Sequence, residues 1–463
     1  RSVSIRERRD FSAAIFDCDG NLIANAPHVP VHLGAMGETV RDLIGHRGDA
    51  IAPETVWASN DPYCGGSHLP DVTVVRPVFI GPTRTAFVAV RGHHVDVGGS
   101  TPGSMPPHST HIAEEGMRFR NIRLSSPDGF TPPDLRPSRQ PEELRADLMA
   151  QIAAVTHGAE GIKSLAAEVG EAAFSAQLGH LLTAAERSTR RLLQRMTGTH
   201  EAQEVLDDGT EINVRMDVVD GRARVHIDAP AHPGNLNAPA AVARAAVLYV
   251  LRCLVNEPLP LLNEGSLRRV TIETNAGGLF DPREPAAVAG GNVETSQRLV
   301  DALLRAVNAQ ASSQGTMNNL TVGNDSGVWY ETIGGGSGAG PGFHGSNAVQ
   351  VHMTNTRSSD VEEVECRFPV RLIEWRCRSG SGGNGRWRGG EGTAKIWQFL
   401  SSAQVSILAE RRAAGAPGAD GGRPGLPGID EIDRGAGWEP ALPHFDARPG
   451  DRLRIQTPGG GGG

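Results

Sequence analysis

Short apolar runs separated by glycine, proline and asparagine fill residues 1–131 and predict a strand-rich unit. The runs DVTVVRPVF (71–79) and TAFVAVRG (85–92) flank a short connection, so we expect them to pair as an antiparallel hairpin. The stretch DCDGN (17–21) predicts a second hairpin, because glycine and asparagine tolerate the positive φ of tight turns. A helix is expected over 34–45.

The pattern changes after residue 141. Up to about Thr197 the apolar residues recur at three- and four-residue spacing, which predicts two or three helices with breaks near Gly158 and Gly170. Period-two alternation then predicts a hairpin around Asp220, a buried helix is expected over 239–255, and a further helix is expected over 296–311.

The remainder of the chain is rich in glycine and in short strand-like runs. Together these patterns predict an α+β fold with several mixed subdomains. The expected divisions are a strand-rich metal-binding subdomain over 1–131, a helical segment over 141–198, an α+β subdomain over 199–312 and a glycine-rich, β-dominated subdomain over 313–463.

Composition and charge narrow the classes of function. The chain has 463 residues with a net charge of −8, which argues against nucleic acid as its main partner. None of its apolar runs approaches the length of ~20 residues that a membrane-spanning helix needs. Its five cysteines are odd in number and lack Cys-x-x-Cys spacing, which suits free thiols in a reducing compartment. With no recognisable secretory signal, we expect a cytoplasmic protein.

Two common catalytic motifs are absent from the sequence. Lys163 and Lys395 are the only lysines, and neither stands in the GxxxxGK[ST] phosphate-binding loop, so ATP chemistry would need another fold or another chain. The serine motif G-x-S-x-G is also missing. Cys64 could act as a nucleophile, but an isolated free cysteine more often packs as a small apolar residue.

The strongest chemical signal is a set of histidines and aspartates at the ends of the hairpin. His68 and Asp71 lie where the chain enters its first strand, and His93 and His94 follow its second, so the pairing should bring these residues together. Successive strand residues face opposite ways, so at most one of His93 and His94 is expected to be a metal ligand. The alternative is that these are solvated polar residues at strand ends. Spacing leaves three aspartates open as a further donor: Asp10, Asp61 and Asp96.

Several glycine-rich segments have two interpretations. GGNVETSQ (290–297) places Glu294 or Thr295 near a helix start. SQGTMNNL (313–320), ETIGGGSGAGPG (331–342) and SGSGGNGRWRGGEG (379–392) could offer backbone amides to an anion or be tight turns between strands, and physical reasoning favours turns. ERR (410–412) could be an anion clamp or a surface salt-bridge pair.

Nine blocks of sequence resemble the hydantoinase B family, which includes N-methylhydantoinase B subunits, the C-terminal half of 5-oxoprolinase, caprolactamase and one subunit type of acetone and acetophenone carboxylases. In chain order they are ERRDFSAAIFDCDGNLIANAPHVPVHLGAM, NDPYCGGSHLPDVTVVRPVF, RGHHVDVGG, PGSMPPHSTHIAEEG, GGNVETSQRLVDALL, SQGTMNNLTVG, YETIGGGSGA, HMTNTR and GSGGNGRWRGGEG. Because they span nearly the whole chain, the resemblance is highly specific.

The resemblance implies a site and a partner. It implies one divalent metal, with zinc preferred and manganese or iron as alternatives, held by Asp10, His68, Asp71 and His93. His94, Asp96 and Glu115 are then candidates for orienting ligands or transferring protons, and Asn318, Asn319, Gly334 and Gly335 for lining a substrate pocket. The implied partner is a hydantoinase A-type subunit with an actin-like fold that carries ATP and Mg²⁺, in a heterotetramer or larger assembly.

The activity implied is ATP-dependent hydrolysis of a cyclic amide such as a hydantoin, a lactam or 5-oxoproline. The alternatives are a subunit of an ATP-dependent ketone carboxylase and a non-catalytic scaffold for the A subunit. Two segments depart from the family pattern: MRFRNIRL follows EEG where many members have Ile-Pro-Pro, and AVQVHMTNT replaces GVHTHMTNT. The substrate therefore stays open.

Overall fold

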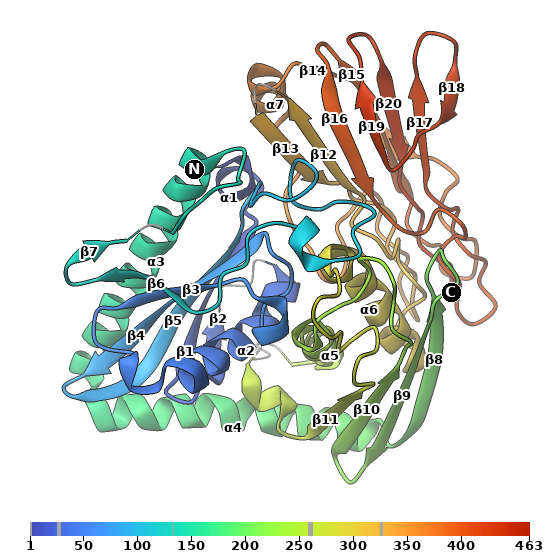
Figure 1. Cartoon of the computed structure of the whole chain (residues 1–463). Coiled ribbons are helices and arrows are strands. Elements are labelled where there is room, and N and C mark those ends of the chain that lie inside the picture. The colour runs from blue at the N-terminus through green and yellow to red at the C-terminus, as the bar shows by residue number, and fades with distance from the viewer. Residues whose placement is uncertain (1, 26–28, 132, 258–262, 325–326) are drawn as a thin grey trace.

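The structure is a computed structural model that describes residues 2–25, 29–131, 133–257, 263–324 and 327–463 (Figure 1). The fold is α+β, as predicted from the sequence. The helices are α1 (Val3–Arg6), α2 (Pro30–Arg47), α3 (Pro141–Val169), α4 (Glu171–Arg195), α5 (Ala240–Leu254), α6 (Ser296–Ala306) and α7 (Val361–Arg367).

The strands form four sheets. The first ten strands are β1 (Phe11–Asp17), β2 (Leu22–Asn25), β3 (Val56–Ser59), β4 (Asp71–Ile80), β5 (Thr83–His93), β6 (Ile122–Ser126), β7 (Gly129–Phe130), β8 (Gly198–Val205), β9 (Glu211–Val219) and β10 (Arg222–Asp228). The others are β11 (Val270–Thr274), β12 (Asn319–Asn324), β13 (Gly327–Thr332), β14 (Val370–Arg378), β15 (Gly392–Phe399), β16 (Ala403–Leu408), β17 (Ile429–Asp433), β18 (Trp438–Pro440), β19 (His444–Ala447) and β20 (Arg452–Gln456).

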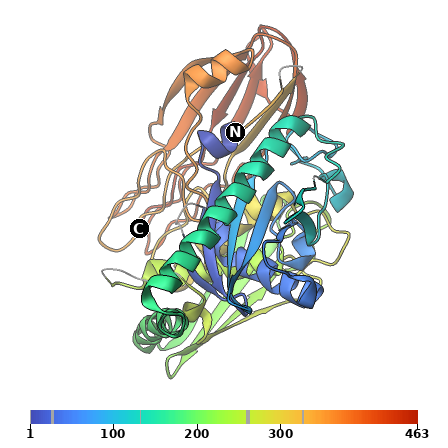
Figure 2. The same ribbon diagram turned by 90° about the vertical axis from the view of Figure 1, so that its left-hand side faces the viewer.

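The first sheet has the order β2-β1-β5-β4-β3-β6-β7 and is covered by helices on both faces. Alternate residues of its central strands pack on α3, as Val74 and Val88 do with Leu148, and α3 crosses that face in Figure 2. The intervening residues, such as Val75 and Phe87, pack against α2 on the other face. The predicted β4–β5 hairpin is confirmed, and both faces of these strands are buried.

The helix α3 corrects one prediction. It continues through Gly158, where a break was expected, and ends before Gly170, whose φ is +87°. A Cβ at position 158 would lie 2.9 Å from Val88 Cγ1. Gly158 therefore allows the helix to lie close to the sheet, and tertiary packing outweighs its weak helix propensity.

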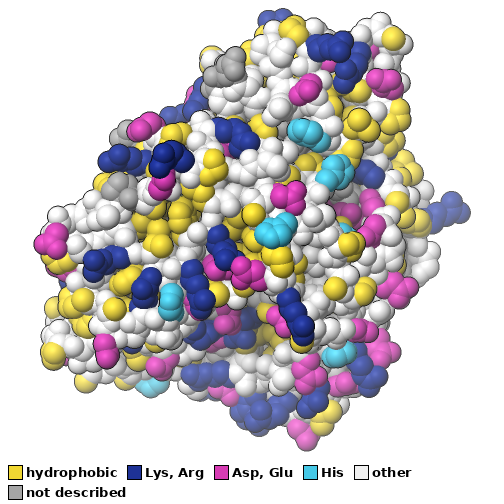
Figure 3. Space-filling view, in the orientation of Figure 1, with side chains coloured by type: hydrophobic (Ala, Val, Ile, Leu, Met, Phe, Trp, Pro, Cys, Tyr) yellow, Lys and Arg dark blue, Asp and Glu magenta, His cyan; other side chains and the backbone are white. Residues whose placement is uncertain are grey.

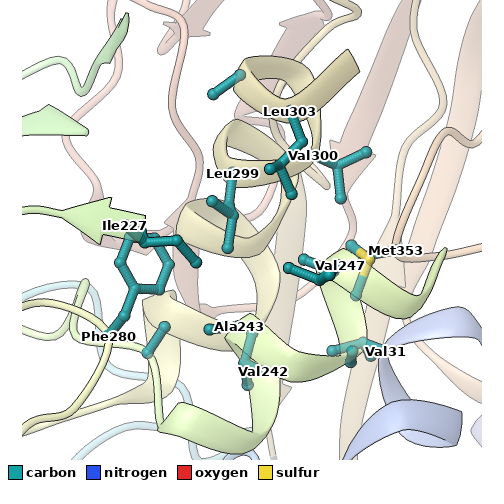
Figure 4. Close-up of a cluster of buried hydrophobic side chains, with 14 of the residues drawn as sticks. Val31, Ile227, Val242, Ala243, Val247, Phe280, Leu299, Val300, Leu303 and Met353 are labelled. Atoms are coloured by element: carbon teal, nitrogen blue, oxygen red, sulfur yellow. The ribbon is translucent and has the colours of Figure 1, made fainter. Parts of the chain in front are cut away.

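The second sheet, ordered β11-β10-β9-β8, packs on α5 and α6. Figure 4 shows Val242 and Val247 of α5, Leu299 and Leu303 of α6, and Ile227 of β10 meeting in one apolar cluster. The predicted hairpin around Asp220 and both predicted helices are present.

The last two sheets face each other across an aromatic core. Their orders are β13-β12-β16-β19 and β14-β15-β20-β17-β18. Trp329 from the first and Trp397 from the second meet edge to face, with ring centroids 4.8 Å apart. The three sequence-predicted boundaries near residues 131, 198 and 312 stay predictions.

The glycine-rich segments are neither isolated turns nor open loops. They run side by side as extended chains whose backbones are directly hydrogen-bonded: Gly460 N donates to Gly390 O at 2.9 Å, and Gly390 N donates to Ser337 O at 2.8 Å. A Cβ on Gly460 would lie 2.0 Å from Ser337 O, so no larger residue fits there. These glycines are therefore required by the close approach of neighbouring backbones.

The surface carries charges of both signs. On the face in Figure 3, arginine and lysine side chains are interspersed with aspartate and glutamate, and neither sign dominates. Among the described residues, no helix is both long enough and apolar enough to cross a membrane.

Candidate metal centre

The ends of β4 and β5 create the centre. Asp71 is the first residue of β4 and pairs directly with His93, the last residue of β5. His68 lies just before β4, in the loop that follows the short 3₁₀ helix Pro62–Cys64. The hairpin register thus brings His68, Asp71 and His93 together, as the sequence predicted.

The distances suit a single cation. Asp71 Oδ1 lies 3.1 Å from His68 Nε2 and 3.3 Å from His93 Nδ1. Each of the three residues offers one potential ligand atom, and these atoms all lie within 4.8 Å of one another. All three side chains are buried. A mixed His/Asp donor set of this kind suits zinc, manganese or iron.

The unpartnered nitrogens test whether these residues fit a metal. Neither ring nitrogen of His68 has a hydrogen-bond partner, and His93 Nε2 also has none. Buried polar atoms normally have partners, so these nitrogens fit a role as metal ligands. Burial alone would raise the pKa of Asp71, but His68 and His32 lower it well below its usual range. The carboxylate is therefore ionised, as a metal ligand must be.

The two oxygens of Asp71 have different neighbours. Oδ1 faces the histidine pair, whereas Oδ2 accepts hydrogen bonds from Ser67 Oγ at 2.7 Å and Asn292 Nδ2 at 3.4 Å. His32 Nε2 also lies 3.3 Å from Oδ2, and its Nδ1 is 3.2 Å from Ser12 Oγ. These contacts hold the carboxylate with one oxygen free for the cation, which is the usual task of residues around a metal site.

The ring of His93 is held by stacking. It lies against Tyr330 of β13, with centroids 4.7 Å apart and planes 24° apart. The guanidinium of Arg8 lies over the Tyr330 ring at 4.5 Å. Tyr330 Oη donates to Asn319 Oδ1 at 2.9 Å, so the C-terminal sheet helps to position His93, a candidate ligand from the first sheet.

None of the three aspartates considered as a further donor joins this cluster. Asp10 lies beside it: its backbone oxygen accepts from His93 N at 3.0 Å, and its Oδ2 is 3.9 Å from Arg8 Nη1. The carboxylate of Asp61 caps the 3₁₀ helix, and that of Asp96 accepts from Gly98 N and Arg139. The role of Asp10 as a fourth ligand stays a prediction.

The residues expected to transfer protons lie around the centre rather than inside it. His94 faces the opposite way from His93, and its Nε2 is 2.9 Å from Gln151 Oε1 on α3. Burial lowers the pKa of His94. Glu115 accepts hydrogen bonds from Ser109 Oγ and from Val288 N and Ala289 N, and burial raises its pKa to about 7. The catalytic roles of His94, Asp96 and Glu115 stay predictions.

The residues expected to line a substrate pocket are also buried. Asn318 Nδ2 donates to Gln314 Oε1 and to Ile333 O, while Asn319 Nδ2 donates to Glu294 Oε1 at 2.8 Å. The two glycines expected there lie in the glycine-rich segments and pack closely against neighbouring backbone: Gly334 and Gly335. Substrate binding by these four residues stays a prediction.

Cys64 does not have the environment of a nucleophile. Burial and the nearby Asp61 raise the pKa of its thiol to about 11, so little thiolate forms near neutral pH. All five cysteines are free, as predicted.

Sequence reasoning missed four residues that contact the centre: His32, Ser67, Asn292 and Tyr330. The first two lie inside blocks that resembled the family, HVPVH and GGSHLPD, but no spacing rule marked them. Asn292 and Tyr330 are more than 200 residues from Asp71 in the chain, so only the fold reveals their proximity.

Comparisons with known proteins agree with this structure. The sequence model of the family described as "Hydantoinase B/oxoprolinase" matches residues 1–463. 5-Oxoprolinase 1 of Arabidopsis thaliana is 42% identical over 502 residues, covering 100% of this chain and 39% of the relative. The chain thus spans about two fifths of the length of that relative.

Two solved structures share the fold. The ATP-dependent caprolactamase from Pseudomonas jessenii superposes with a TM-score of 0.90 and 25% identity, covering 99% of this chain and 87% of that one. A nucleotide-free acetone carboxylase gives a TM-score of 0.89 at 15% identity, covering 100% of this chain and 72% of that one, which shows a common fold. Because the family match spans the whole chain, this protein belongs to the hydantoinase B/oxoprolinase family.

Proposed function

We propose that this chain is the metal-binding part of an ATP-dependent hydrolase of cyclic amides. The observation that carries the proposal is the buried cluster of His68, Asp71 and His93, whose imidazole rings have unpartnered nitrogens. The relatives support the reaction class: one is a 5-oxoprolinase, and the caprolactamase is described as ATP-dependent.

The chemistry explains why ATP is consumed. A cyclic amide resists water because its carbonyl is stabilised by resonance with nitrogen. Transfer of the terminal phosphoryl group of ATP to the carbonyl oxygen releases ADP and makes the carbon electrophilic. Water then adds to that carbon, the C–N bond breaks to give an amine, and a second water displaces phosphate to leave a carboxylate. The products are the ring-opened amino acid, ADP and phosphate.

The residues of this chain would hold and surround a cation at the end of the hairpin. When bound, a divalent cation supplies a Lewis acid and lowers the pKa of water. Ser67, His32 and Asn292 fix the Asp71 carboxylate. The aromatic ring of Tyr330 fixes the plane of His93. Glu115, whose pKa is raised to about 7 by burial, would exchange protons near neutral pH.

An ATP-binding partner completes the proposal. The sequence lacks the phosphate-loop motif, and the chain spans only 39% of the Arabidopsis relative, so that relative has further segments available for nucleotide binding. We expect a hydantoinase A-type chain or segment to bind ATP and Mg²⁺, in a hetero-oligomer located in the cytoplasm. Zinc is the expected metal of this chain, with manganese or iron as alternatives.

The test is reconstitution with an A-type partner. The pair is incubated with ATP, the metal and a panel of hydantoins, lactams and 5-oxoproline, and products are identified by mass spectrometry. The proposal predicts a ring-opened amino acid and phosphate in equal amounts. A β-keto acid formed from a ketone and bicarbonate would identify a carboxylase instead. Equal activity of the partner with and without this chain would indicate that the chain is dispensable.

A further inference from the structure

Arg91 is a buried arginine whose hydrogen bonds to the described residues all go to neutral oxygens. It lies on β5, two residues before His93, and its side chain is 0% exposed. A buried charge without an ion-pair partner in contact is costly, and proteins rarely keep one. The arrangement of this guanidinium therefore requires an explanation.

The guanidinium connects several parts of the chain. Nε of Arg91 donates to Thr73 Oγ1 on β4 at 2.7 Å, and Nη2 donates to Thr39 Oγ1 on α2 at 2.9 Å. Nη2 also donates to Gly65 O at 3.2 Å, and Nη1 makes a longer hydrogen bond to Ser67 Oγ at 3.5 Å. Gly65 and Ser67 belong to the loop before β4, so Arg91 ties this loop to α2 and to the hairpin.

Arg91 also fixes the direction of two further hydrogen bonds. A guanidinium can only donate, so a hydroxyl oxygen that accepts from it directs its own hydrogen to another acceptor. Ser67 Oγ donates to Asp71 Oδ2 at 2.7 Å, and Thr39 Oγ1 donates to Gly65 O at 2.7 Å. The first of these bonds holds the carboxylate, and the second holds the loop.

The position of the His68 ring depends on this loop. Neither ring nitrogen has a hydrogen-bond partner among the described residues, so the imidazole is placed by the backbone that carries it. At one end of that backbone, a Cβ on Gly65 would lie 2.4 Å from the carbonyl carbon of Glu38, which shows how closely the loop lies on α2. At the other end, His68 O accepts from Asp71 N at 3.1 Å.

We propose that Arg91 is a positioning residue of the metal centre: through Gly65 and Ser67 it places His68 and Asp71 in the geometry that binds the cation. The inference rests on the metal-binding part of the proposed function. Neutral partners suit this role, because a carboxylate beside the guanidinium would be a competing ligand for the cation. The hydroxyl groups transmit geometry without adding a charge.

The experiment titrates the full chain, freed of metal, with Co²⁺, whose visible absorption reports the geometry of its ligands. In Arg91→Met we expect an altered spectrum and an affinity weakened by about 10–100-fold, the usual cost of losing a residue that orients metal ligands. Arg91→Lys keeps the charge but not the planar fork, so its affinity should lie between those of Arg91→Met and the wild type. Ser67→Ala should also weaken binding, and its effect should be smaller when Arg91→Met is already present.

Arg76→Met is the matched control. Arg76 is a buried arginine of β4 in the same hairpin, and its Nη1 donates to Thr156 Oγ1 of α3 at 2.9 Å. Its loss should lower the denaturant midpoint but leave the Co²⁺ spectrum and affinity of the wild type. If Arg91→Met does not fold, Arg91→Lys and Ser67→Ala provide the comparison.

Three results would overturn the inference alone. One is a wild-type spectrum and affinity in the Arg91 and Ser67 variants, and another is an equal loss of affinity in Arg76→Met. The third is tighter binding in Arg91→Met, because removal of a positive charge without any change of geometry would strengthen the binding of a cation. A wild type that binds no Co²⁺ would overturn the inference together with the proposed metal centre.

Discussion

Two clusters of buried polar side chains in this chain differ in how completely they are partnered. One is the candidate metal centre formed by His68, Asp71 and His93. The other, here called the arginine cluster, consists of five charged residues from β8, α6 and the segment after β16: Glu204, Arg298, Asp301, Glu410 and Arg411. Both are remote from solvent, but they satisfy their polar atoms in different ways.

The carboxylates of the arginine cluster each have a cationic neighbour. Arg411 lies 2.8 Å from Glu204 Oε2 and 3.4 Å from Asp301 Oδ2, and Arg298 lies 3.2 Å from Glu410 Oε2. Burial alone would raise the pKa of Glu204, but Arg411 and Arg298 lower it. Only the Nε atoms of the two arginines lack partners. The ERR segment is thus neither an anion clamp nor a surface pair, because Arg411 is buried in this cluster.

The candidate metal centre, in contrast, leaves several polar atoms without a partner. Its single carboxylate faces two histidines, and three of their four ring nitrogens have no hydrogen-bond partner. A cluster whose carboxylates are paired with arginines stabilises the folded state. A cluster whose buried nitrogens lack hydrogen-bond partners is suited to binding a ligand. The variants below test that distinction.

The largest loss of stability should come from Arg298→Ala. The substitution leaves Glu204 and Glu410 buried with fewer cations, and an uncompensated buried charge costs about 3–5 kcal/mol. We expect a clear fall in the denaturant midpoint. The exposed pair of Arg215 and Glu201, at 2.9 Å, provides the control, because Arg215→Ala should cost less than about 1 kcal/mol. Equal midpoints for the two variants would contradict a structural role for the arginine cluster.

Tyr330→Leu should weaken metal binding with a smaller effect on folding. Without the stacked ring, His93 is free to rotate, and loss of such support typically costs about 10–100-fold in metal affinity. Competition with a chromogenic chelator measures the affinity. Tyr330→Phe keeps the ring and loses only the hydrogen bond to Asn319, so its affinity should lie closer to the wild type. Wild-type affinity in Tyr330→Leu would show that stacking does not position the ligand.

Glu294→Gln should change the pH dependence of stability. Burial raises the pKa of Glu294 to about 8 from an ordinary value of 4.5. Between these two pH values the folded state keeps this proton, whereas the unfolded state loses it. The contribution of Glu294 to the free energy of unfolding therefore falls as pH rises, by at most about 1.4 kcal/mol per pH unit. The variant lacks this fall, so its stability relative to the wild type should increase from pH 5 to pH 8. Thermal denaturation measures both proteins across this pH range. If the stabilities of the variant and the wild type changed in parallel with pH, the raised pKa of Glu294 would be contradicted.

The sequence was most informative where contacts are local. The alternation in β4 and β5 predicted their pairing, and that pairing places His93 opposite Asp71 with His94 on the other face. The helices of residues 141–195 were also predictable from periodicity. The continuation through Gly158 was not, because it depends on how closely the helix approaches Val88 in the sheet.

The supports of the centre could not be predicted from spacing. Asn292 precedes α6 and Tyr330 lies in another sheet, so they reach Asp71 and His93 only when distant parts of the chain pack together. Arg411 gives a similar lesson: its charge suggested an exposed or anion-binding role, but three-dimensional packing pairs it with Glu204. Long-range polar contacts leave little trace in local composition.

Metal content is the most direct test of the account. The chain is purified without chelators and analysed by plasma mass spectrometry beside the variants Asp71→Ala, His93→Ala and His94→Ala. We predict about one zinc, manganese or iron per chain in the wild type and in His94→Ala, and loss of the metal in the other two. Metal lost equally from His93→Ala and His94→Ala, or no stoichiometric metal in the wild type, would contradict the proposed centre.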